Sequence, residues 1–164
     1  MSVSINTSVR QPIGVFDSGV GGLTVLRHLI HTMPQEEFVY LGDTARVPYG
    51  NKSPETIRHY TRQCVNFLLG FDVKAIVIAC NTASALALDL ARELSPVPVI
   101  GMIDPAAKTA VDKTKNGNIG IIGTRATIGS HAYERAINEY AKGAGKSIQV
   151  FAKACPLFVP LAEE

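Results

Sequence analysis

The chain has 164 residues, of which 46% are hydrophobic and 18% charged, and its formal net charge is +2. This composition excludes an intrinsically disordered protein, and the apolar runs are too short to span a membrane. Lysine and arginine are scattered among acidic residues, so we expect no nucleic-acid partner, and residues 1–11 lack the apolar core of a signal peptide, so we expect a cytoplasmic protein.

Short apolar runs alternate with longer amphipathic stretches along the chain, a pattern typical of an α/β protein with a parallel sheet flanked by helices. The predicted strands are Ile13–Phe16, Phe38–Leu41, Ala75–Ala79, Val97–Gly101, Ile119–Ile122 and Ile148–Ala152. The predicted helices are Leu23–Met33, Pro54–Leu69, Leu86–Leu94, Pro105–Lys113 and Ala126–Ala141. We expect most of one domain over residues 1–98 and part of a second over 99–164, because prolines interrupt the helical pattern near residues 95–98. The loop after Gly101 is the alternative boundary.

The first strand ends at an acid, a hydroxyl and a glycine-rich turn, Asp17-Ser18-Gly19-Val20-Gly21-Gly22. A turn of this composition lets the backbone approach an anionic ligand closely. It lacks the Lys-Ser/Thr ending of a P-loop and the spacing of a dinucleotide fingerprint, so a nucleotide site is disfavoured. Asp17 and Ser18 could equally be N-capping residues of the following helix.

Two further strands end in polar turns. Pro48-Tyr49-Gly50 follows the second strand and is either a structural turn or a loop that lays backbone N–H groups and a tyrosine over a small ligand. Thr124 and Thr127 follow the strand that ends near Ile122. They are candidates for capping the next helix or for binding a carboxylate.

Cys80 follows the apolar run Ala75–Ala79 and precedes Asn81 and Thr82, which are good N-caps. The thiol is therefore expected between the carboxyl end of a strand and a helix N-terminus, where parallel sheets bind ligands. The helix dipole favours the thiolate there, so we expect a lowered pKa and a reactive thiol. The alternative is a buried structural cysteine.

The other two cysteines are Cys64, within a helical pattern and expected in the core, and Cys155. Three cysteines without metal-ligand spacing predict reduced thiols and no metal site.

Taken together, four motifs resemble those of the bacterial glutamate racemase family, in the same order along the chain: Phe16-Asp17-Ser18-Gly19-Val20-Gly21-Gly22-Leu23-Thr24-Val25, Gly42-Asp43 with Pro48-Tyr49-Gly50, Ala79-Cys80-Asn81-Thr82-Ala83-Ser84, and Gly123-Thr124. The resemblance implies a cofactor-independent isomerase that supplies D-glutamate for peptidoglycan. It also implies an aspartate/glutamate racemase-like fold, in which two α/β domains face each other and each contributes one catalytic cysteine.

Carried over from that family, Cys80 is the acid/base on one face of the substrate, and Asp17 assists its proton transfer or meets the substrate ammonium. The resemblance assigns binding of glutamate, the expected small-molecule partner, to Asp17, Ser18, Tyr49, Gly50, Asn81, Thr82 and Thr124. A homodimer is one assembly open to such a protein.

One feature departs from the family. Its second cysteine lies in a later Gly-Cys-Thr-His-Tyr-Pro motif that this sequence lacks, and Cys155 is not followed by Thr-His. We therefore expect an N-terminal portion of a racemase, inactive alone, with the apolar segment Pro156–Leu161 left uncovered. A racemase for aspartate or another amino acid, and a non-catalytic binding module, are the alternatives.

Overall fold

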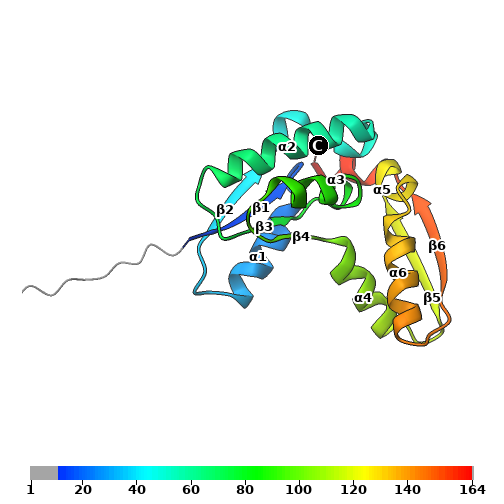
Figure 1. Ribbon diagram of the computed structural model, residues 1–164. Helices are drawn as coiled ribbons and strands as arrows, with labels where there is room; N and C mark the ends of the chain where they lie inside the picture. Colours follow the sequence, from blue (N-terminus) through cyan, green and yellow to red (C-terminus); the bar gives the residue numbers. More distant parts are fainter. Residues whose placement is uncertain (1–10, 164) are drawn as a thin grey trace, which may run out of the picture.

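The computed structural model describes residues 11–163, which form two groups of strands and helices (Figure 1). The first group contains a four-stranded sheet in the order β2-β1-β3-β4, made of β1 (Ile13–Asp17), β2 (Phe38–Gly42), β3 (Ala75–Ile78) and β4 (Val99–Gly101). The second contains β5 (Asn118–Gly123) and β6 (Gln149–Ala154). All neighbouring strands run parallel, which confirms the predicted parallel α/β class.

Seven α-helices lie among the described residues: α1 (Gly22–Thr32), α2 (Pro54–Leu69), α3 (Asn81–Leu94), α4 (Ile103–Lys113), α5 (Arg125–Gly129), α6 (Ala132–Gly143) and α7 (Phe158–Glu163). Two short 3-10 turns, Thr44–Arg46 and Tyr49–Asn51, precede α2. The start of α2 follows from its sequence, since the Ser53 side chain accepts a hydrogen bond from the Thr56 amide and Pro54 takes the first helical position. No helix in the described part of the chain is long and apolar enough to cross a membrane.

Helices cover both faces of the first sheet. Phe16, Ile76 and Ile78 point to the face that packs against α2 and α3, whereas Val15 and Val77 point to the face that packs against α1. All of β1 is buried because it lies inside the sheet and between two helical layers. Cys64 on α2 belongs to this core, as expected.

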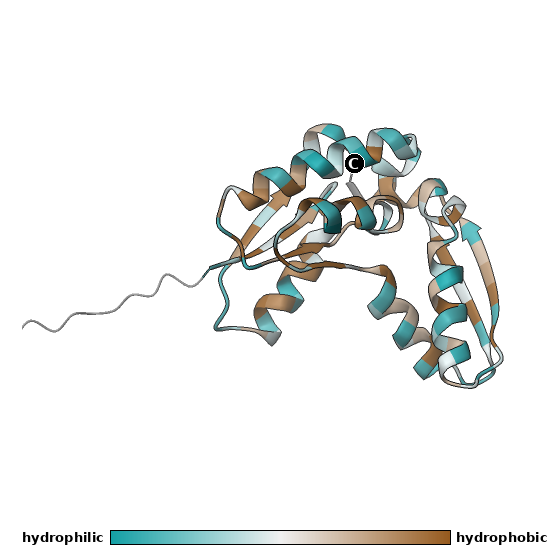
Figure 2. Cartoon of the chain, in the orientation of Figure 1, coloured by the Kyte–Doolittle hydropathy of each residue, from teal (hydrophilic) through white to brown (hydrophobic). Residues whose placement is uncertain are grey.

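The second sheet is covered on one face by α4 and α6, which bury Ile119 and Ile121 of β5. On the other face, Ile122 is 65% exposed and Phe151 is 55% exposed. Brown, hydrophobic segments are visible along both strands in Figure 2. This apolar surface has no helix over it within residues 11–163.

The structure corrects the prediction of one helix over Ala126–Ala141. The chain forms α5 and α6 instead, because His131 adopts a left-handed conformation with φ of 54° between them. The apolar segment after Cys155 also forms a short helix, α7, that we did not predict. The domain boundary between residues 98 and 99 stays a prediction; β4 pairs with β3 in the first sheet, and the chain passes to the second group after it.

Candidate functional site

The first and third strands bring Asp17 and Cys80 to the same edge of the first sheet. Phe16 pairs with Ile78 across the neighbouring parallel strands, so the residues that follow these two emerge at the shared carboxyl edge. Asp17 is 6% exposed and Cys80 is 5% exposed. This edge is where open parallel sheets bind their ligands.

The Asp17 carboxylate organises the glycine-rich turn beside it. Its Oδ2 atom accepts hydrogen bonds from the amides of Gly19, at 3.1 Å, and Gly22, at 2.8 Å. A Cβ atom on Gly22 would lie 2.4 Å from the Asp17 Cβ atom, so the close approach of the turn to Asp17 requires glycine here. The N-cap of α1 is Gly21 rather than Asp17 or Ser18, so the N-capping alternative is wrong as stated. The Asp17 carboxylate nevertheless accepts the amide of Gly22, the first residue of that helix.

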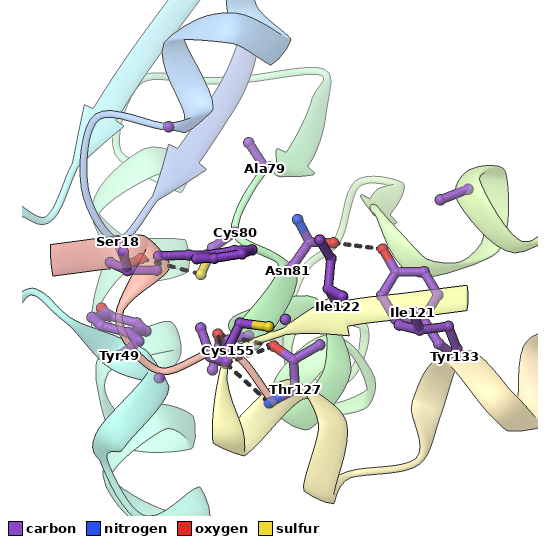
Figure 3. Close-up of a pocket in the computed structure, with 18 of the residues that line it drawn as sticks. Ser18, Tyr49, Ala79, Cys80, Asn81, Ile121, Ile122, Thr127, Tyr133 and Cys155 are labelled. Atoms are coloured by element: carbon purple, nitrogen blue, oxygen red, sulfur yellow. Dashed lines mark hydrogen bonds between the residues drawn. The ribbon is translucent and has the colours of Figure 1, made fainter. Parts of the chain in front are cut away.

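Cys80 itself is the N-cap of α3. Its Sγ atom accepts a hydrogen bond from the Ala83 amide at 3.4 Å, and its thiol donates to Ser18 Oγ at 3.2 Å (Figure 3). We had expected Asn81 and Thr82 to cap the helix, but both lie inside it. Because the cysteine takes the capping role, these two side chains are left for other contacts.

Burial raises the pKa of the Cys80 thiol, and the negative charge of Asp17 raises it further. The hydrogen bonds that Cys80 makes with Ser18 and with the Ala83 amide lower this pKa, but burial and Asp17 outweigh them. The expected lowering of this pKa is therefore wrong for the ligand-free protein, because the helix N-terminus does not compensate for loss of solvent and a neighbouring carboxylate. The neutral thiol is the resting form.

Three threonine hydroxyls join the two groups of elements. Thr82 Oγ1 lies 3.1 Å from the hydroxyls of both Thr124 and Thr127, and these two lie 2.9 Å apart. Thr124 also caps α5, since its hydroxyl accepts a hydrogen bond from the Thr127 amide at 3.1 Å. Thr82 belongs to α3, whereas Thr124 and Thr127 lie at the N-cap and in the first turn of α5. The hydrogen bonds of this threonine cluster therefore link the two groups of elements.

Tyr49 faces the protein interior at its hydroxyl end. It is 1% exposed and donates a short hydrogen bond to Asp43 Oδ2, while Arg46 Nε lies 2.7 Å from the same oxygen. Burial raises the pKa of Tyr49, and burial with the Asp43 charge raises the pKa of the neighbouring Cys64 to about 11. The hydroxyl of Tyr49 therefore bonds to Asp43, and Tyr49 contributes its ring and backbone to the pocket.

Gly50 lies against the second group. A Cβ atom at this position would be 2.5 Å from Thr124 Cβ, so only glycine permits this packing. The contact places the Tyr49–Asn51 turn beside the threonine cluster.

A single pocket of about 580 Å³ gathers all eight residues singled out from the sequence: Asp17, Ser18, Tyr49, Gly50, Cys80, Asn81, Thr82 and Thr124. It extends between the two sheets along α4, β5 and α6. Other lining residues were not predicted as site residues, among them Tyr133, Phe158 and Val159, because no motif marks them.

The pocket is polar at one end and apolar at the other. The thiols of Cys80 and Cys155, one carboxylate and several hydroxyls lie at one end, whereas alanines of α4 and isoleucines of β5 line the remainder. Within residues 11–163, no cluster of three or more histidine, cysteine or acidic side chains has the geometry of a metal site. The arrangement suits a small zwitterion, whose ammonium and carboxylate need opposite partners, next to a group that can exchange a proton.

Comparison with known proteins gives a family match over nearly the whole described chain. Residues 13–159 match the family model described as Asp/Glu/Hydantoin racemase. Glutamate racemase from Geobacter metallireducens is 53% identical over 152 residues, covering 93% of this chain and 55% of the relative. Glutamate racemase from Chlorobaculum tepidum is 54% identical over 158 residues, covering 96% of this chain and 57% of the relative.

Solved structures agree with these matches. The chain superposes on glutamate racemase isoform RacE1 from Bacillus anthracis with a TM-score of 0.87 and 44% identity, covering 92% of this chain and 55% of that one. The TM-score is 0.83, with 43% identity, for the Francisella tularensis glutamate racemase in complex with D-glutamate, and the match covers 93% of this chain and 56% of that one. The chain therefore spans little more than half the length of the relatives it matches.

Proposed function

The chain belongs to the Asp/Glu/Hydantoin racemase family, and we propose that its pocket is the Cys80 side of a site that interconverts L- and D-glutamate. The observation that carries the proposal is the convergence of the Cys80 thiol, the Asp17 carboxylate and the hydroxyls of Ser18, Thr82 and Thr124 on one pocket. The bound D-glutamate of the Francisella tularensis relative supports glutamate as the substrate.

Inversion of an α-carbon requires a base that removes the α-proton on one face and an acid that returns a proton to the other. In the proposed site Cys80 performs one of these transfers, through Sγ. Breaking the Cα–H bond sends the electron pair toward the substrate carboxylate, so the site must donate hydrogen bonds to that carboxylate. Thr82, Thr124 and the carboxamide of Asn81 provide such donors at the pocket wall.

Substrate binding would change the charge balance at Cys80. Asp17 raises the pKa of this thiol in the empty pocket. A substrate ammonium next to Asp17 neutralises that carboxylate and adds a positive charge close to the sulfur, and both effects stabilise a thiolate. The proposal therefore couples formation of the base to the arrival of an amino acid, using side chains alone and no added cofactor.

The opposite face of the substrate needs a second proton carrier. Among the described residues, Cys155 is the other cysteine that lines the pocket, and it lies near Thr127 in Figure 3. Candidates for the second transfer are thus Cys155, a cysteine from a second copy in a homodimer, and a residue supplied by the part of the relatives' length that this chain does not span. A cytoplasmic location remains part of the proposal.

The test is incubation of the purified chain with L-glutamate in heavy water. Proton NMR follows loss of the α-proton, and circular dichroism follows conversion to the D-enantiomer. We expect α-proton exchange that falls at least about 100-fold in Cys80→Ala, the usual scale for a lost acid/base group, and is unchanged in Cys64→Ala. Exchange that persists in Cys80→Ala would contradict the proposal.

The same assay locates the second proton carrier. Exchange without inversion means that Cys80 works alone from one face. Conversion to D-glutamate that disappears in Cys155→Ala assigns the second transfer to Cys155. Faster exchange with L-aspartate than with L-glutamate would instead favour a racemase for a shorter substrate.

A further inference from the structure

Tyr133 reaches across the pocket from the second group of elements to the first. It lies near the start of α6, and its hydroxyl donates a hydrogen bond of 2.6 Å to Oδ1 of Asn81, the first residue of α3 (Figure 3). Both side chains line the pocket, and Asn81 directly follows Cys80. No motif in the sequence pointed to Tyr133.

The bond decides which end of the Asn81 carboxamide faces the ligand. A carboxamide carries one acceptor oxygen and two N–H donors, and its terminal torsion is otherwise broad. Asn81 has no capping role, because the Cys80 sulfur takes it, and the side chain is exposed to the pocket. With the oxygen held by the Tyr133 hydroxyl, the nitrogen lies on the side away from Tyr133 (Figure 3).

The environment of Tyr133 favours donation of this hydrogen bond to Asn81. Burial raises the pKa of its phenol, which favours the protonated hydroxyl that donates this bond. The ring is held by packing with the buried cluster of α4, β5 and α6. A ring held by this packing can keep an acceptor in one orientation, whereas a mobile water molecule could not.

We propose that Tyr133 is a positioning residue that fixes the Asn81 carboxamide with its N–H groups toward the pocket, so that this part of the site accepts a carboxylate oxygen and rejects a donor. The identity of that ligand as an amino-acid carboxylate rests on the function proposed above; the orientation of Asn81 does not. Because Tyr133 and Asn81 belong to different groups of elements, the donor is presented only when α6 lies against the start of α3.

The first experiment examines the ligand-free protein by NMR of the side-chain amide of Asn81. In the unaltered chain the chemical shifts of the two N–H groups report the one orientation of the Asn81 carboxamide. Tyr133→Phe, which removes only the hydroxyl, should shift both resonances. Tyr140→Phe, on the same helix, is the matched control and should change neither. Unchanged Asn81 resonances in Tyr133→Phe would overturn the proposal.

The second experiment measures glutamate affinity in a double-mutant cycle of Tyr133→Phe and Asn81→Ala. Loss of one neutral hydrogen bond should weaken binding about threefold to tenfold in Tyr133→Phe, with no further loss when Asn81 is already alanine. Equal losses in both backgrounds would mean that Tyr133 acts without Asn81 and would overturn the proposal. If the unaltered chain binds no glutamate, the proposed function fails, while the resonances of Asn81 still decide the role of Tyr133.

Discussion

The two sheets of this molecule repeat the same strand-to-helix connection but differ in how completely they are covered. Cys80 caps α3 at the end of β3, and Thr124 caps α5 at the end of β5, each through a side-chain atom that accepts an amide hydrogen bond. Helices lie on both faces of the first sheet, whereas the second presents Ile122 and Phe151 to solvent.

The two regions also contribute different groups to the pocket. The first sheet places Asp17 at the end of β1 and Cys80 just beyond the end of β3, and both residues are buried. The second contributes the apolar wall, the threonine cluster through Thr124 and the hydroxyl of Tyr133. The proposed acid/base residue Cys80 therefore lies at the sheet that helices cover on both faces, and ligand contacts extend to the sheet that they cover on one face.

Truncating one isoleucine in each sheet should give the largest difference in stability between the two regions. Ile78 on β3 is fully buried, so Ile78→Ala is expected to lower the free energy of unfolding by about 2–5 kcal/mol. The matched change Ile122→Ala on β5, at a side chain that is 65% exposed, should alter it by no more than about 0.5 kcal/mol. Urea unfolding measures both, and similar losses would show that the second sheet is buried in solution.

The cluster beneath the Tyr49 turn should give the next largest effect. Asp43→Ala removes the acceptor of both Tyr49 and Arg46, and we expect a loss of about 1–3 kcal/mol in the free energy of unfolding. Tyr49→Phe removes one hydroxyl and leaves the Asp43–Arg46 pair, so its loss should be only about 0.5–1.5 kcal/mol. A larger loss for Tyr49→Phe would contradict this ordering.

Stability should also fall at alkaline pH because of Cys64. Its pKa is raised from 9.0 to about 11 by burial and by Asp43, so the unfolded chain loses this proton first as the pH rises. The stabilisation is complete below pH 9 and is lost between about pH 9 and 11, by at most about 2–3 kcal/mol. Urea midpoints at pH 8 and 10.5 should differ less in Cys64→Ala than in Cys155→Ala, and equal differences would count against this account.

The sequence was sufficient for the parallel sheet and for the residues at its edge, because apolar runs followed by polar turns are local signals. It was insufficient where a property depends on contacts between residues that are far apart in the chain. The pKa of Cys80 is set by burial and Asp17 rather than by the helix that follows it, and the contact of Tyr133 with Asn81 joins residues far apart in the chain. The break at His131 was missed because a left-handed residue leaves little trace in hydrophobic periodicity.

The most direct test of the central claim is a titration of the isotope-labelled chain with D-glutamate, in which backbone amide shifts locate the bound ligand. We predict that the largest shifts fall on Gly50, Ala83 and Thr124, around the pocket that holds Cys80. A second, charged groove of about 470 Å³ is lined by other residues, including Arg58 of α2 and Arg92 of α3. Shifts confined to that groove, or no shifts at all, would contradict the assignment of the Cys80 pocket as a glutamate site.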